Sequence, residues 1–131
     1  MTGRIERLQN AFDIEIQWTA FPLHPDTPVE GRTLEELFAG RDVDVDQMVG
    51  HFKQVANDLG LPFGDRKMTY NSRLAQEMGK WAESNGKGDE FHDAVFRAYF
   101  ADGRNIAEAT VLVAVADSVG LNGQDAQKII Q

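Results

Sequence analysis

Three aspartates alternate along one short stretch of the chain, and carboxylates with this spacing can surround a calcium ion. Asp42, Asp44 and Asp46 match the first, third and fifth positions of such a loop. The loop also needs glycine at its sixth position and a bidentate glutamate at its twelfth, where this chain has Gln47 and Lys53. We therefore interpret the acids as solvated residues at the start of a helix, and we expect no metal site here.

The histidines are the next side chains that could bind a metal or move a proton. His24, His51 and His92 are widely separated, so no helix presents two imidazoles on one face to zinc. His24 lies in a proline-rich stretch, where it is either a substrate contact or an exposed structural residue. His92 lies among acidic residues, and we expect it to be their solvated partner.

Nucleophiles are the third class to consider. The chain has no cysteine, which excludes a thiolate, a disulfide and a cysteine zinc site within these residues. Ser72, Ser84 and Ser118 have no G-x-S-x-G context, and the Gly86-Lys87-Gly88 turn lacks the rest of a phosphate-binding loop. The residue pattern alone therefore predicts no catalytic residue.

The composition of the chain limits the classes of molecule that it can bind. The formal net charge is -8 and the pI is near 4.7, so the chain repels nucleic acid and anionic membranes. No apolar run approaches the ~20 residues that cross a bilayer, and no basic start precedes an apolar stretch. We expect a soluble, cytoplasmic protein with no nucleic-acid or membrane partner.

The elements that must position these side chains begin with a helix end at residues 1–10 and an alternating segment at residues 12–20. Apolar residues there take every second position, as in a strand with one buried face. No other segment alternates as well, so the neighbouring strand is expected to come from elsewhere. Residues 21–31 hold three prolines and predict an extended loop.

Everything after this loop has helical character. Thr33 and Glu36 form a capping box for a short helix. Apolar stripes of helical period, with capping residues and glycine stops, predict further helices over about 44–59, 71–85, 89–102, 107–119 and 122–131. Ile129 and Ile130 lead straight into the end of the chain, so we expect both ends to adjoin further polypeptide.

Aromatic and methionine side chains on these stripes could line a groove or pack between helices, and we favour packing. They are Met48, Phe52, Met78, Trp81, Phe91, Phe96 and Tyr99.

Three stretches carry a resemblance. Residues 18–31, WTAFPLHPDTPVEG, resemble W-x-P-F-x-L-x-P-D-x-P-x-E-G, with Ala20 where proline is common. Residues 71–75 resemble the start of N-[TS]-x-x-A-H-x-L, with Gln76 where histidine is common. Residues 96–121, from FRAYF through GRNI to VL and GL, are the most specific match. Together they resemble the DsbA-like thioredoxin-fold family, in particular its FrnE-like branch.

The resemblance implies an α/β, predominantly helical chain, a partial thioredoxin-like fold with a helical insertion domain and one edge strand. Residues 1–31 would be the remnant of the thioredoxin-fold part, 32–121 the helical insertion domain, and 122–131 a helix returning to the rest of the fold. It also implies a C-P-W-C type motif just before Met1 and a cis-proline loop beyond Gln131.

By the same resemblance, the parent protein would be a thiol-disulfide oxidoreductase acting on protein thiols or a small thiol. This chain would lack the dithiol and be inactive alone. It would provide substrate-groove contacts at Phe21, His24, Asn71 and Ser72, with no catalytic residue and no metal. Asn71 is equally explained as a helix cap.

Two alternatives stay open. A relative of 2-hydroxychromene-2-carboxylate isomerase or kappa-class glutathione transferase would carry serine in place of the first cysteine and use glutathione. A noncatalytic helical binding module would form a homo-oligomer through the exposed strand and apolar faces.

Overall fold

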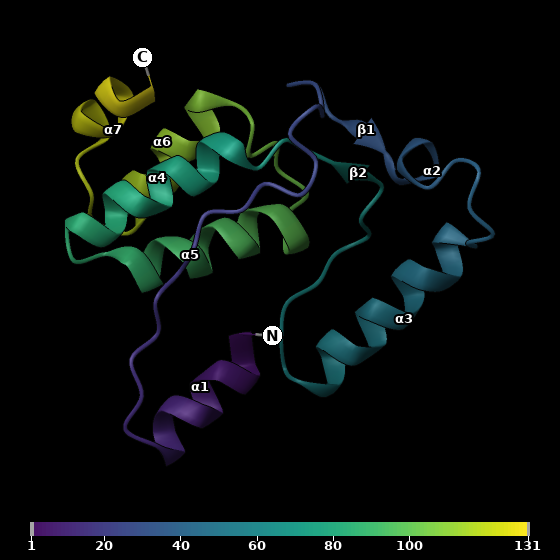
Figure 1. Cartoon of the computed structure of the whole chain (residues 1–131), viewed down its shortest axis with the longest axis horizontal. Coiled ribbons are helices and arrows are strands. Elements are labelled where there is room, and N and C mark those ends of the chain that lie inside the picture. Colours follow the sequence, from purple (N-terminus) through teal and green to yellow (C-terminus); the bar gives the residue numbers. More distant parts are fainter. Residues whose placement is uncertain (1, 131) are drawn as a thin grey trace.

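Helices dominate the computed structural model, which describes residues 2–130. The described elements are seven α-helices, one turn of π-helix and one pair of two-residue strands (Figure 1). This arrangement confirms the predicted predominantly helical α/β class. Met1, the first residue of the helix end predicted over residues 1–10, lies outside the described residues.

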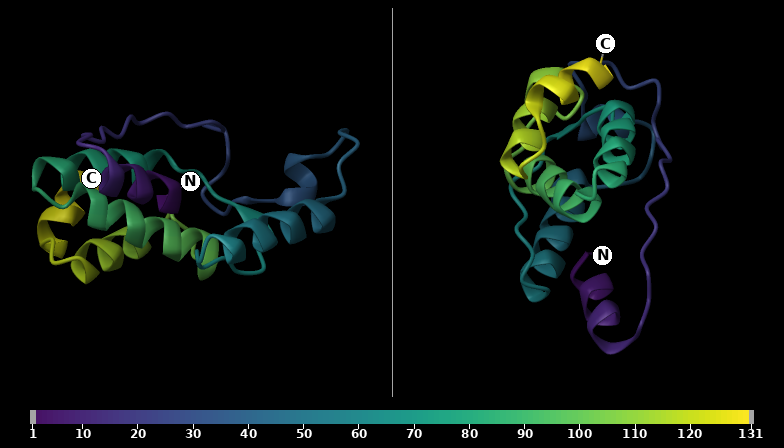
Figure 2. Two further views of the ribbon diagram at one scale, coloured as in Figure 1. Left: turned by 90° about the horizontal axis from the view of Figure 1, so that it is seen from below. Right: turned by 90° about the vertical axis from the view of Figure 1, so that its left-hand side faces the viewer.

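The first helix leads into a long extended segment. Helix α1 spans Thr2–Ala11, as predicted, and residues 12–22, here called the strap, run along one side of the molecule (Figure 2). The strand predicted over residues 12–20 is extended but pairs with no other strand among residues 2–130. A ladder needs a neighbour with matching donors and acceptors, and the described chain offers none here. Phe12 is 64% exposed and Ile14 42%, so the apolar face is only partly covered.

The paired strands lie elsewhere. Strands β1 (Arg32–Thr33) and β2 (Met68–Thr69) are antiparallel, with Arg32 opposite Thr69. Helix α2 (Leu34–Leu37) follows β1 directly, and its predicted capping box is present. Glu36 N donates to Thr33 Oγ1 over 3.1 Å, and Thr33 N donates to Glu36 Oε2 over 2.9 Å.

Helix α3 (Val45–Asp58) lies between the two strands in sequence and projects to one side of the strand pair (Figure 1). Asp44 caps it by accepting from Gln47 N over 2.9 Å. Asp44 therefore has the role expected of an acid at a helix start. Gly60, with φ of +68°, follows the helix and turns the chain back toward β2.

The helices that follow β2 pack together and are here called the helical body (residues 73–130). Its elements are α4 (Arg73–Ser84), α5 (Gly88–Phe96), η1 (Arg97–Ala101), α6 (Ala109–Ser118) and α7 (Gly123–Ile130). Its buried core contains Ala75, Met78, Ala82, Phe91, Ala98, Ile106, Leu112, Val115, Ala116, Leu121 and Ala126. Helix α6 contacts α4, α5 and α7, which explains why it is apolar around most of its circumference.

The helical body differs from the sequence prediction at one place. The single helix expected over residues 89–102 changes into a π-helical turn at Arg97, where Asp102 N donates to Arg97 O over 3.0 Å. Such a turn inserts one extra residue and rotates the side chains that follow. The proposed division at residues 31 and 121 stays a prediction, although Ala126 of α7 is buried in the helical core.

None of the helices described over residues 2–130 combines the length and the apolar character needed to cross a bilayer.

Candidate functional site

A cleft of about 610 Å³ lies where α1, α3 and the α5–η1 helix face one another. This volume suits a small molecule or a few residues of an extended peptide. Its lining comes from three parts of the chain that are far apart in sequence. The residues are Gly3, Glu6, Arg7, Asn10, Phe52, Val55, Ala56, Leu59, Gly60, Leu61, Pro62, Phe63, Asp93, Phe96, Arg97 and Phe100.

Most of this lining is apolar, and its charges are balanced. Glu6 and Arg7 come from α1, while Asp93 and Arg97 come from the opposite wall and form an ion pair of 2.8 Å. That pair is about half exposed, so solvent screens it and its stabilisation is small. A mostly apolar lining with a few charged groups is typical of sites that bind a ligand by burying its apolar groups.

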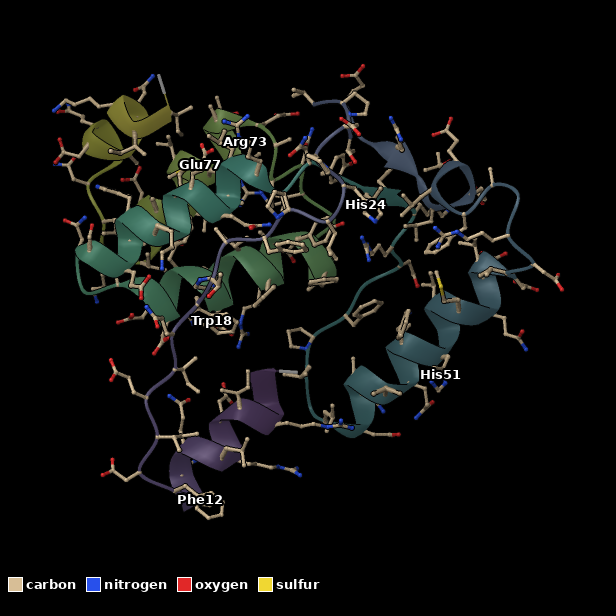
Figure 3. The ribbon with its side chains drawn as sticks, in the orientation of Figure 1. Phe12, Trp18, His24, His51, Arg73 and Glu77 are labelled. Atoms are coloured by element: carbon tan, nitrogen blue, oxygen red, sulfur yellow. The ribbon has the colours of Figure 1, made fainter. Side chains whose placement is uncertain are left out.

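An aromatic row connects the cleft with the strap. Phe63 stacks on Phe100 with centroids 5.9 Å apart, and Phe100 lies 6.0 Å from Phe96. The row continues through His92, 6.1 Å from Phe96, to Trp18, which stacks on His92 at 4.3 Å. One end of the row lines the cleft and the other holds the strap against α5 (Figure 3).

Gly64 allows the backbone after α3 to approach η1 closely enough for Phe63 to stack on Phe100, at the end of the row that lines the cleft. Its N–H donates to Phe100 O over 2.8 Å, which fixes the segment after α3 against η1. A Cβ built on Gly64 would lie 2.3 Å from Ala101 O, so any larger residue would push the two backbones apart. The row therefore depends on glycine at this position.

The strap end is fixed by polar contacts as well as by stacking. Trp18 Nε1 donates to Asp89 Oδ1 over 3.1 Å, and Lys80 Nζ donates to Trp18 O over 2.8 Å. His92 is half-buried beneath the indole, and the expectation that it is a solvated partner of acids was wrong. Its burial lowers the pKa of the imidazole, although Asp89 opposes the shift.

Similarity to known proteins agrees with this architecture. The family model of the DSBA-like thioredoxin domain matches residues 1–131. The chain belongs to this family.

Two relatives illustrate the match. The chain is 27% identical over 116 residues to the uncharacterized protein YwbO of Bacillus subtilis (strain 168), covering 85% of this chain and 54% of that protein. The crystal structure of the probable DsbA oxidoreductase SCO1869 from Streptomyces coelicolor superposes with a TM-score of 0.85 at 21% identity. That match covers 98% of this chain and 60% of the other, and it supports the fold. The chain thus spans little more than half the length of either protein.

Within this DSBA-like chain, the four predicted groove residues gather around the proline-rich loop. Phe21 is 72% exposed and His24 is exposed, both on the loop itself. Asn71 Nδ2 donates to Pro25 O over 2.9 Å and to Thr27 O over 2.8 Å, tying that loop to the start of α4.

Ser72, next to Asn71, accepts from Gln76 Nε2 over 2.9 Å. Asn71 therefore contacts the loop that carries Phe21 and His24, and none of the four predicted residues lines the cleft. Their role in substrate contact stays a prediction.

The sequence did not single out Phe63 or Phe100 as site residues. Phe100 belongs to the stretch of closest family resemblance, which was a usable signal, whereas Phe63 follows a Leu-Pro pair with no pattern around it. Phe52 and Phe96, expected to pack in the core, line the cleft instead, and Phe52 is 50% exposed. Phe91 and Met78 are buried as expected.

Metal ligands do not cluster in the part of the chain that the structure describes. No group of three histidine or acidic side chains comes together within residues 2–130. His24 and His51 lie well apart, on different parts of the molecule (Figure 3).

Proposed function

We propose that this chain forms the substrate-binding cleft of a DSBA-like thiol-disulfide oxidoreductase, and that the reacting cysteines are not among its 131 residues. The main support for this proposal is that Gly3, in the first turn of α1, lines the same apolar cleft as Phe100. A thiolate beside a helix N-terminus has a lowered pKa and reacts readily. A cysteine there would therefore face whatever apolar group the cleft holds.

The chain cannot perform dithiol exchange by itself, because it has no sulfur nucleophile other than methionine thioethers. The FrnE-like branch and a cytoplasmic location belong to the same proposal. The three motif stretches support the branch.

An engineered thiol tests the proposal. In the Gly3→Cys variant the new Cβ would meet Leu61 Cδ2 at 3.7 Å, an ordinary contact, so the fold should tolerate it. The Gln9→Cys variant places the same thiol on α1 away from the cleft. Because the chain has no other cysteine, each variant reports one position.

Each variant is mixed with peptides whose single cysteine carries thionitrobenzoate. The engineered thiolate attacks the peptide sulfur, forms a chain–peptide disulfide and releases coloured thionitrobenzoate thiolate. We expect Gly3→Cys to react about tenfold faster with a peptide flanked by leucine and phenylalanine than with one flanked by serine and glycine. Gln9→Cys should react equally with both, and equal rates at Gly3→Cys would contradict the proposal.

A further inference from the structure

Arg66 carries a half-buried guanidinium that is held by neutral groups. Its Nε donates to Met68 O over 3.3 Å, and Nη2 donates to the hydroxyl of Tyr99. Its Cζ lies 4.6 Å from the ring centroid of Tyr99 and 5.2 Å from that of Phe100. Cation–π contact with two rings fixes the plane of the guanidinium and partly offsets the desolvation of its charge.

No carboxylate among residues 2–130 forms an ion pair with this charge. Within residues 2–130 the ion pairs use exposed cations, such as Lys53 with Asp65 and Arg73 with Glu77, and none includes Arg66. The chain has 21 acidic residues against 13 lysines and arginines, so carboxylates are not scarce. A partly buried charge without a counter-charge is unfavourable, and an anion that reaches it is bound more strongly than at an exposed side chain.

The guanidinium also keeps unused hydrogen-bond donors. It has five N–H groups, of which the bonds to Met68 and Tyr99 use two. Tyr99 Oη lies 3.1 Å from Thr69 Oγ1, so its own bonding capacity is shared with a buried hydroxyl. The remaining N–H groups form the planar fork that matches the two oxygens of a carboxylate.

We propose that Arg66 binds a carboxylate of the ligand that occupies the cleft. Arg66 is not itself among the residues that line the cleft, but the ring of Phe100 both lines the cleft and lies under the guanidinium, so the charge is one ring away from a bound ligand. The carboxylate belongs either to an acidic residue or chain end of a bound peptide, or to a small free acid. The inference takes the cleft as the ligand site from the proposed function, but it needs no thiol chemistry.

Two peptides that differ in one group test the proposal. Acetylated and amidated Gly-Phe-Glu-Leu-Gly and its glutamine counterpart are titrated into the ¹⁵N-labelled chain at low ionic strength, where charge pairing is least screened. Sodium acetate is titrated separately as the small acid. The readouts are the Kd and the Nε–Hε resonance of Arg66.

We expect wild type to bind the glutamate peptide about fivefold more tightly than the glutamine peptide. Arg66→Gln should lose this preference and leave the affinity for the glutamine peptide unchanged. Arg41→Gln is the matched control, since Arg41 also lies over one ring, Phe38 at 5.8 Å, but is exposed and away from the cleft. It should keep the preference.

Equal affinity of wild type for both peptides, with no acetate response at Arg66, overturns the proposal. So does a glutamate preference that survives in folded Arg66→Gln. If Arg66→Gln unfolds, the Nε–Hε resonance of Arg66 in the wild type tests the proposal instead. This resonance must shift when the glutamate peptide is added and must not shift when the glutamine peptide is added. An acetate shift without binding of either peptide supports the carboxylate site with a small acid as its source, and counts against a peptide-binding cleft.

Discussion

The indole of Trp18 stacks on the imidazole of His92, with ring centroids 4.3 Å apart and planes inclined by 24°. The strap is otherwise an extended segment without a paired neighbour in the described structure. Together with the bonds to Asp89 and Lys80, this stack fastens the strap to the helical body. The strap leads directly from α1, which forms one wall of the cleft.

Removing the indole should therefore free the strap. Trp18→Ala loses the stack and the bond to Asp89, and we expect a loss of about 1–2 kcal/mol in the free energy of unfolding, measured by urea denaturation. Limited proteolysis within residues 12–20 should accelerate while α6 stays uncut. Trp18→Phe keeps a ring on His92 and should lose less. Unchanged cleavage in Trp18→Ala would show that other contacts hold the strap.

His92 makes stability depend on pH. Burial lowers the pKa of its imidazole from the ordinary 6.5, against the opposing effects of Asp89 and Glu83 and with a small further lowering from Lys80. Between the two pKa values the unfolded chain binds more protons, so this contribution to stability is lost as pH falls from above 6.5 through the folded-state pKa.

The measurement is the free energy of unfolding of wild type and His92→Phe across pH 5.5 to 7.5. The phenyl ring keeps the stack but cannot take up a proton, so the variant should lose less stability on acidification than wild type. His51→Phe, an exposed position on α3, should behave like wild type. A wild-type pH dependence retained in full by His92→Phe would rule out this origin.

Structural features that depend on residues close together in the sequence could be predicted from the sequence. The capping box of Thr33 and Glu36 is present as expected, and Asn122 accepts from Gln124 N over 2.9 Å at the start of α7. These contacts depend on residue type and spacing within one turn, which a sequence displays directly. Most helix boundaries could be predicted to within a few residues because they depend on the same capping residues and on glycine stops.

Contacts between distant segments could not be predicted in this way. Trp18 was assigned to the buried face of a strand, and its actual partner, His92, was assigned to solvent, because alternation says nothing about which surface will be adjacent. The π-turn at Arg97 and the close approach of Gly64 to Ala101 depend on packing between elements. The cleft depends on both, and for this reason it was not foreseen.

Asn71 should control the loop that displays two of the predicted groove residues. Asn71→Asp is nearly isosteric but places a carboxylate against the carbonyl oxygens of Pro25 and Thr27, which now accept from the amide. We expect a loss of about 1–3 kcal/mol in the free energy of unfolding. Fast exchange should appear in the loop around His24. Ser72→Ala, which removes only the bond from Gln76, should leave the loop ordered, and a rigid loop in Asn71→Asp would contradict this role.

Gly64 and Gly50 should respond in opposite directions to the same added methyl group. Gly64→Ala directs its Cβ to within 2.3 Å of Ala101 O, so the segment must move and the bond to Phe100 O must lengthen. We expect a loss of about 1–3 kcal/mol in urea denaturation, as for overpacking elsewhere. Gly50→Ala lies within α3 with nothing within 4 Å of the new Cβ, and should gain about 0.5–1 kcal/mol from helix propensity alone.

The resonances of Phe100 distinguish this explanation from general destabilisation. In Gly64→Ala they should shift under native conditions, because the ring loses its stack on Phe63 at one end of the aromatic row. In Gly50→Ala they should not move. If Gly64→Ala matched wild type in both stability and spectrum, the backbone after α3 could not approach η1 closely, and neither the cleft nor the position of Arg66 beside it would have the geometry on which ligand binding is inferred.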